Sequence, residues 1–166
     1  MLDIVIDRLT NSIRNTISDD IFNTEIIEVK LTEKGLAKKD WAFDWKYEIR
    51  QNDRKVFKLV IENNPDIIQG LISITDNLDH IFMNLIESSK FNKGKRKLYE
   101  GVPGNLVAFA CRLSFEKGYD GIVSFIAKTI LIKHYERTLG AKIFRGNQMY
   151  IDTPEALKLL RQYFNK

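Results

Sequence analysis

The stretch KGKRKLYEGVPGNLVAFACRLSFEKG, residues 93–118, places a cluster of cations and a Gly-Val-Pro-Gly turn directly ahead of a predicted helix. Apolar residues recur at helical spacing up to Gly118, a residue type that commonly ends helices: Leu106, Phe109, Ala110 and Leu113. The first turn of a helix offers unpaired N–H groups and the positive end of its dipole. Gly101 and Gly104 would let a bulky anion approach that turn, and nearby cations would add charge: Lys93, Lys95, Arg96 and Lys97. Two interpretations stay open here, a cradle for a phosphorylated ligand and a solvated loop before an ordinary helix.

The chain ahead of this stretch has the pattern of β-strands from residue 41 to residue 89. TEIIEVKL (residues 24–31) already has the composition of a strand. RKVFKLVIE, IIQGLISIT and HIFMNLIESS follow at residues 54–62, 67–75 and 80–89, and the turn signals NNPD and DNLD separate them. These three segments predict an antiparallel meander.

The chain after the stretch alternates strand and helix. GIVSFIA (residues 121–127) is almost entirely apolar, which is typical of a strand buried on both faces. A right-handed crossover through the helix makes it parallel to residues 80–89. A helix over residues 129–140, a hairpin turning at residues 146–147 and a C-terminal helix follow. That last helix has Thr153 as the expected N-cap, Pro154 in its first turn and one apolar face: Leu157, Leu160 and Phe164. We predict one α/β (α+β) domain over residues 1–166, a mixed sheet with helices packed on it.

Composition predicts an ordinary soluble globular protein. The 166 residues are 44% hydrophobic and 29% charged, and a net charge of +4 is spread along the chain. The single cysteine, Cys111, indicates a reducing compartment and is expected to be a small core residue. No apolar run approaches the roughly 18 residues of a membrane span, and MLDIVIDRLT does not resemble a signal peptide. We therefore expect a cytoplasmic protein that does not bind a membrane.

Several kinds of site are not supported by the sequence. His80 and His134 stand alone, so no metal site is expected, and no Ser-His-Asp arrangement can be identified. The glycines around residue 101 match neither a P-loop nor a dinucleotide fingerprint. Nucleic-acid binding is unlikely, because KFNKGKRK (residues 90–97) lacks an accompanying basic stripe. Trp41, Phe43 and Trp45 alternate, which predicts either a buried sheet face or an aromatic wall beside a substrate.

The order of elements over residues 82–141 resembles the GNAT superfamily of acetyl-CoA-dependent N-acyltransferases. FMNLIESS looks like the central strand of that family, GVPGNL like its pyrophosphate loop, and AFACRLSFEKGYDGIVSFIA like the helix and strand that follow. HYERTLGA is similar to its Tyr-x-x-x-Leu-Gly helix end. The loop, Lys128 and Leu131 depart from the family pattern. The resemblance implies a mostly antiparallel sheet with helices on both faces and a splayed central pair of parallel strands.

The resemblance also implies a chemistry, the direct transfer of an acetyl group from acetyl-CoA to a primary amine. Backbone groups of Ile86, Glu87 and Ser88 would pair with pantetheine, and the helix start would hold the diphosphate through Gly101, Val102, Gly104, Asn105 and Leu106. Tyr135 would protonate the leaving thiolate, and Glu87 would be the base. The acceptor would be a small molecule or a protein, and a homodimer stays open.

Two alternatives to that enzyme follow from the departures. One is a catalytically inactive GNAT-fold module that binds CoA or another protein. The other, hinted at by the basic loop, is a toxin-like enzyme that modifies a macromolecular amine.

Overall fold

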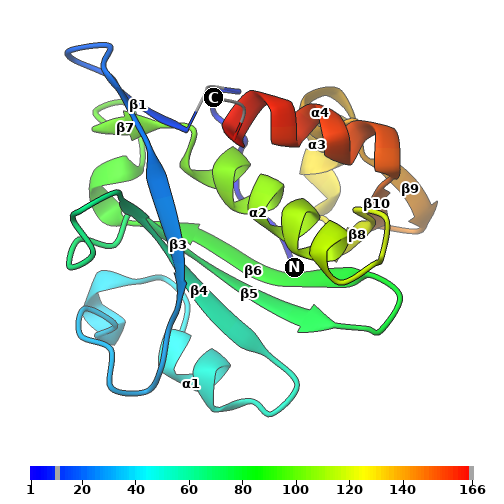
Figure 1. Ribbon diagram of the computed structural model, residues 1–166, viewed down its shortest axis with the longest axis horizontal. Coiled ribbons are helices and arrows are strands. Elements are labelled where there is room, and N and C mark those ends of the chain that lie inside the picture. The colour runs from blue at the N-terminus through cyan, green and yellow to red at the C-terminus, as the bar shows by residue number, and fades with distance from the viewer. Residues whose placement is uncertain (10–11, 165–166) are drawn as a thin grey trace.

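A computed structural model describes residues 1–9 and 12–164, and its centre is one seven-stranded sheet (Figure 1). All neighbouring strands are antiparallel except the central pair, β6 and β8. The strand order is β3 (Thr24–Glu28), β4 (Lys55–Ile61), β5 (Gly70–Asp76), β6 (Ile81–Ser88), β8 (Val123–Ile126), β10 (Gln148–Ile151) and β9 (Lys142–Arg145). The predicted meander is therefore confirmed as β4–β5–β6, and the predicted hairpin as β9–β10.

The parallel pair separates soon after it forms. β6 and β8 pair through three residue couples, from Ile81↔Val123 to Met83↔Phe125, whereas β6 continues to Ser88. Beyond Met83 the two strands have no ladder between them. This divergence confirms the splayed central pair that the family resemblance implied.

Helices cover both faces of the sheet, as predicted. On one face lie α2 (Val102–Glu116), α3 (Ile132–Leu139) and α4 (Thr153–Phe164), and they share the larger apolar core with the sheet. On the other face, α1 (Trp45–Arg50) covers a smaller apolar cluster. Three short 3-10 turns also occur: η1 (Lys38–Asp40), η2 (Lys90–Asn92) and η3 (Thr129–Leu131). No helix in the described residues is long and apolar enough to cross a membrane.

A small second sheet stands beside the large one. Its strands are β2 (Ile21–Phe22), β1 (Ile13–Asn15) and β7 (Tyr99–Glu100), all antiparallel. Because β7 immediately precedes α2, this sheet ties the residues before β3 to the start of α2. The connection brings the N-terminal part of the chain close to the loop that the sequence singled out.

The strand pattern predicted from residue 41 onward is wrong at its start, where the chain forms α1. The Asp44 carboxylate accepts a hydrogen bond from Tyr47 N (3.1 Å) and caps that helix. Trp41 and Trp45 still share an apolar cluster, with ring centroids 6.5 Å apart, and Phe43 packs against the same cluster. The alternating aromatic residues therefore do pack together, but a turn and the first residues of α1 bring them together, not a strand.

The predicted inner face of the C-terminal helix is also wrong. The buried side chains of α4 are Ala156, Leu159 and Tyr163, whereas Leu157 is 42% exposed. Thr153 is the first helical residue, and its hydroxyl donates to Asp120 O (2.6 Å) instead of capping. Tyr163 decides the face, because its ring packs over α2 while its hydroxyl donates to Arg8 O (2.7 Å).

Gly104 lies inside α2, where it leaves room for Tyr163. A Cβ at Gly104 would stand 1.9 Å from the Tyr163 hydroxyl oxygen and 2.5 Å from its Cζ. Backbone and ring can approach this closely only because glycine has no side chain. The sequence singled out Gly104 for an anion, and the fold uses it to pack α2 against α4.

Gly104→Ala is therefore expected to lower the free energy of unfolding by about 1–3 kcal/mol, because the added methyl overlaps a packed ring. Helix propensity alone would favour alanine by roughly 1 kcal/mol, so the two explanations predict opposite signs. In a Tyr163→Leu background the same change should be neutral or stabilising. Urea unfolding of the four proteins in this double-mutant cycle measures the coupling, and an increase in stability for Gly104→Ala alone would contradict the packing.

Candidate active site

The gap between β6 and β8 opens toward the first turn of α2. Gly101 precedes that helix with a left-handed φ of 96°, a conformation that glycine adopts without strain. Val102 and Gly104 lie in the first turn, where backbone N–H groups have no acceptor within the helix. The sheet thus forms a groove that ends at the positive end of a helix dipole.

Residues 2–8 of the same chain run through this groove. Leu2 forms a parallel bridge with Ala127, in which Leu2 N donates to Ile126 O (2.7 Å) and Lys128 N donates to Leu2 O (2.8 Å). Further along, Ile6 N donates to His134 Nε2 (2.8 Å) on α3. Leu2 and Ile6 are 1% and 4% exposed, so both side chains belong to the core. The segment thus pairs beside the end of β8, past the point where β8 leaves β6.

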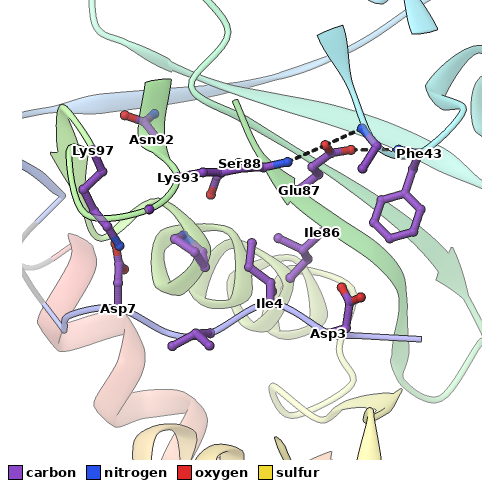
Figure 2. Close-up of a pocket in the computed structure, with 14 residues that line it drawn as sticks. Asp3, Ile4, Asp7, Phe43, Ile86, Glu87, Ser88, Asn92, Lys93 and Lys97 are labelled. Carbon is purple, nitrogen blue, oxygen red and sulfur yellow. Dashed lines mark hydrogen bonds and ion pairs between the residues drawn. The ribbon is translucent and has the colours of Figure 1, made fainter. Parts of the chain in front are cut away.

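The carboxylate of Asp7 lies at the start of α2. Asp7 Oδ1 accepts a hydrogen bond from Gly101 N (3.2 Å), and Lys97 Nζ stands 3.1 Å from Oδ2 (Figure 2). An anion therefore occupies the end of the groove, held by one of the predicted glycines and one of the predicted cations. That anion belongs to the protein itself.

The other predicted loop residues are buried within α2. Val102, Asn105 and Leu106 are fully buried, and Asn105 Nδ2 donates to Thr24 Oγ1 (3.0 Å). Their side chains therefore face the interior, and only backbone groups of this first turn could meet a ligand. Of the cations ahead of the helix, Lys93 and Lys97 are paired with carboxylates of the groove.

Tyr135 points into the same groove from α3. Its hydroxyl donates to Ile4 O (2.6 Å), and its ring stands edge-on to Phe125, 5.3 Å between centroids. Burial raises the pKa of Tyr135 well above its ordinary value. The phenol therefore stays protonated at neutral pH, and residues 2–8 hold its proton.

Glu87 on β6 is enclosed by donors. Ala42 N (2.7 Å) and Lys93 Nζ (2.8 Å) approach Oε2, while Phe43 N (3.1 Å) and Trp45 Nε1 (2.9 Å) approach Oε1. Burial disfavours the charged form, but these four donors outweigh it and hold the pKa of Glu87 below its ordinary value. A carboxylate bound in this way anchors the loop before α1 to the end of β6.

A cavity of about 370 Å³ lies between residues 2–8 and the end of β6. Figure 2 shows Ile4 extending from residues 2–8 and Ile86 from β6, with Asp7 beside Lys97 and Glu87 turned toward Phe43. Ser88 and Pro103 also line it, so this cavity touches the predicted pantetheine strand and the first turn of α2. The side chains give it both signs of charge.

The structure thus brings several predicted site residues to one groove: Tyr135, Glu87, Ile86, Ser88, Gly101 and the first turn of α2. Sequence reasoning missed residues 2–8, and LDIVI was the one available signal, an apolar run with no assigned partner. Cys111 is confirmed as a core residue, where burial raises its pKa to about 12. Among residues 1–9 and 12–164, no group of three or more His, Cys, Asp or Glu side chains is arranged so that it could hold a metal ion.

Comparison with known proteins establishes the fold. No protein-family model and no curated protein sequence matches this chain. Among solved structures, a bacterial toxin matches with a TM-score of 0.60 at 12% identity, covering 88% of this chain and 99% of its own. AtaTR bound with AcCoA matches with a TM-score of 0.59 at 12% identity, covering 83% of this chain and 98% of its own.

A third solved structure belongs to a named acetyltransferase. It is a chimera of the spermidine N-acetyltransferase SpeG from Vibrio cholerae and hSSAT. Its TM-score is 0.53 at 14% identity, and it covers 81% of this chain and 98% of its own. The chain therefore has the GNAT fold, as the motifs over residues 82–141 implied.

Glu87→Gln is expected to lower the free energy of unfolding by about 2–4 kcal/mol. The substitution replaces one carboxylate oxygen by an NH2 group, so the donors that bind that oxygen would lose their acceptor. Glu25→Gln, an exposed change on β3, is the matched control and should change stability by less than about 0.5 kcal/mol. Denaturant unfolding gives both values. Equal stability of the two variants would mean that Glu87 is free to act as a base and does not anchor the loop.

The hydrogen bond from Ile6 N to His134 makes the attachment of residues 2–8 to α3 sensitive to pH. His134 Nε2 accepts from Ile6 N, so the ring must be neutral, and burial together with Arg137 lowers the pKa of His134. The pKa of His134 is therefore lower in the folded than in the unfolded protein. The stability that the neutral ring contributes is complete above about pH 6.5 and is lost as the pH falls below that value.

Unfolding measured from pH 8 to pH 5 is thus expected to show a stability loss below about pH 6.5 that His134→Gln diminishes. His80→Gln is the control and should leave that loss in place. An unchanged pH profile in His134→Gln would contradict the assignment.

Proposed function

We propose that this protein is an N-acyltransferase that uses acetyl-CoA and transfers the acetyl group to a primary amine. The observation that carries the proposal is the divergence of β6 and β8 in front of the first turn of α2. A parallel pair that opens at a helix N-terminus offers strand backbone to an extended amide chain and N–H groups to a diphosphate. The match to AtaTR bound with AcCoA supports the same ligand here.

The residues divide the work of binding as follows. Backbone groups of Ile86, Glu87 and Ser88 at the end of β6 pair with the pantetheine amides. The diphosphate lies against the amides of α2, at the place that the Asp7 carboxylate now takes, with Lys97 beside it. Acetyl-CoA and residues 2–8 cannot both occupy this groove.

Transfer then requires one attack and one proton. The neutral amine attacks the thioester carbonyl, a C–N bond forms and the C–S bond breaks, and CoA leaves as a thiolate. Tyr135 donates its phenolic proton to that thiolate, since its hydroxyl points into the groove and stays protonated at neutral pH. The proton lost by the amine passes through water toward Glu87, whose lowered pKa makes it a weak base.

A second candidate is a catalytically inactive module on the same fold that binds CoA or another protein. The engagement of Glu87 by four donors favours it, since such a carboxylate has little capacity left for a proton. Under either function we place the protein in the cytoplasm, because its one cysteine is buried and unpaired.

Acetyl-CoA at 100 times its dissociation constant is expected to stabilise the protein by about 2.7 kcal/mol, which thermal unfolding detects. Free CoA released from acetyl-CoA over a panel of amines measures catalysis. Stabilisation without release identifies the inactive module that binds CoA, and no stabilisation at millimolar acetyl-CoA contradicts both the enzyme and the CoA-binding module.

Tyr135→Phe is expected to reduce turnover by about 10²-fold or more, because the thiolate then takes its proton from water. Acetyl-CoA binding should be retained, since the lost hydroxyl contacts residues 2–8 and not the diphosphate site. Turnover equal to the wild type would remove the acid role from Tyr135.

A further inference from the structure

We infer that residues 2–8 are an autoinhibitory segment, which must leave the groove between β6 and β8 before acyl-CoA can bind. The inference rests on the acyl-CoA binding proposed above and adds a control step to it. Three contacts along the segment support it, one at each end of the groove and one at its centre.

The first contact is backbone pairing along β8. Leu2 N donates to Ile126 O and Leu2 O accepts from Lys128 N, so the segment forms strand hydrogen bonds inside the splay. The pantetheine proposed above would pair with β6 on the other side of the splay, so the segment competes with it for the space between the two strands. The segment therefore uses groups that line the groove.

The second contact is the Asp7 carboxylate at α2. It takes the hydrogen bond of Gly101 N and the charge of Lys97, the two features that would hold a ligand diphosphate. Two anions cannot share this position, because like charges at contact distance repel each other and both need the same donors. Diphosphate binding thus requires Asp7 to move away.

The third contact lies between these two, on the proposed acid. Ile4 O accepts the proton of the Tyr135 hydroxyl at 2.6 Å, which leaves that proton unavailable to a thiolate. One segment of seven residues thus occupies the anion position and engages the proton donor at the same time. A packing role alone would not require both.

Three of the seven side chains of the segment, those of Asp3, Val5 and Arg8, face solvent, and the segment can be released locally. Only Leu2 and Ile6 are buried, whereas Val5 is 53% exposed. Segments with few buried contacts open without unfolding the domain. If the segment is detached for about 1% of the time, the apparent affinity for acyl-CoA is weakened about a hundredfold.

A reversible covalent lock tests this directly. In the variant Leu2→Cys/Ala127→Cys, the two cysteines replace the partners of one β-bridge, and both positions are buried. Cys111 does not compete, because it is fully buried and its pKa is raised to about 12. Acetyl-CoA binding is measured by titration calorimetry on the oxidised and the reduced forms of the full chain.

The oxidised form is expected to bind acetyl-CoA at least about a hundredfold more weakly than the reduced form. The reduced form should bind at least as tightly as the wild type, because Leu2→Cys removes part of the buried side chain that holds the segment. Equal affinity of the two forms overturns the inference, because the ligand then binds with the segment in place. If the wild type binds no acetyl-CoA, the proposed function is overturned and the inference with it. These outcomes distinguish the failure of the control step from the failure of the function.

The substitution Asp7→Asn provides a second test, which does not depend on a new disulfide. Loss of the charge weakens the hold on Gly101 N and Lys97, so acetyl-CoA should bind about tenfold more tightly than to the wild type. Asp20→Asn removes an exposed carboxylate from the turn before β2 and is the matched control, with no expected change. Unchanged or weaker binding in Asp7→Asn overturns the inference.

Discussion

The parallel pairing of β6 with β8 stops at Met83 and Phe125, and the groove, its anion position and its occupant all depend on that stop. A longer ladder would leave no gap at the first turn of α2. Because β6 continues to Ser88 without β8, the backbone at its end is turned toward residues 2–8 and toward the cavity beside them. The unpaired length of one strand is thus the geometric origin of the site.

Burial and charge then decide what each polar group of the groove can do. Glu87 is neutralised by Lys93 and three N–H donors, and this places it in a structural role while it stays ionised. Burial keeps Tyr135 protonated, and its hydroxyl donates to a backbone carbonyl that belongs to a displaceable segment. With residues 2–8 in place, the Tyr135 hydroxyl is engaged by Ile4 O; with these residues displaced, it could donate its proton to another group.

Much of the fold could be predicted because local periodicity agrees with tertiary packing. The meander β4–β5–β6, the helix α2 and the β9–β10 hairpin each have a pattern and turn residues that point the same way. The prediction failed at Asp44, where a local cap begins a helix in an apparent strand. It also failed at α4, where the contacts of Tyr163 with the distant Gly104 and Arg8 turn the helix so that Leu157 faces outward. Residues 2–8 were beyond reach for the same reason, because their partners are at Ala127, Tyr135 and Gly101.

Amide hydrogen exchange with and without acetyl-CoA tests the central claim most directly, since it follows the segment residue by residue. The account predicts that the amides of Leu2 and Ile6 exchange faster when acetyl-CoA is added, while amides in the first turn of α2 exchange more slowly. Slower exchange, or no change, at Leu2 and Ile6 under saturating acetyl-CoA would contradict it, because the ligand would then bind without displacing them.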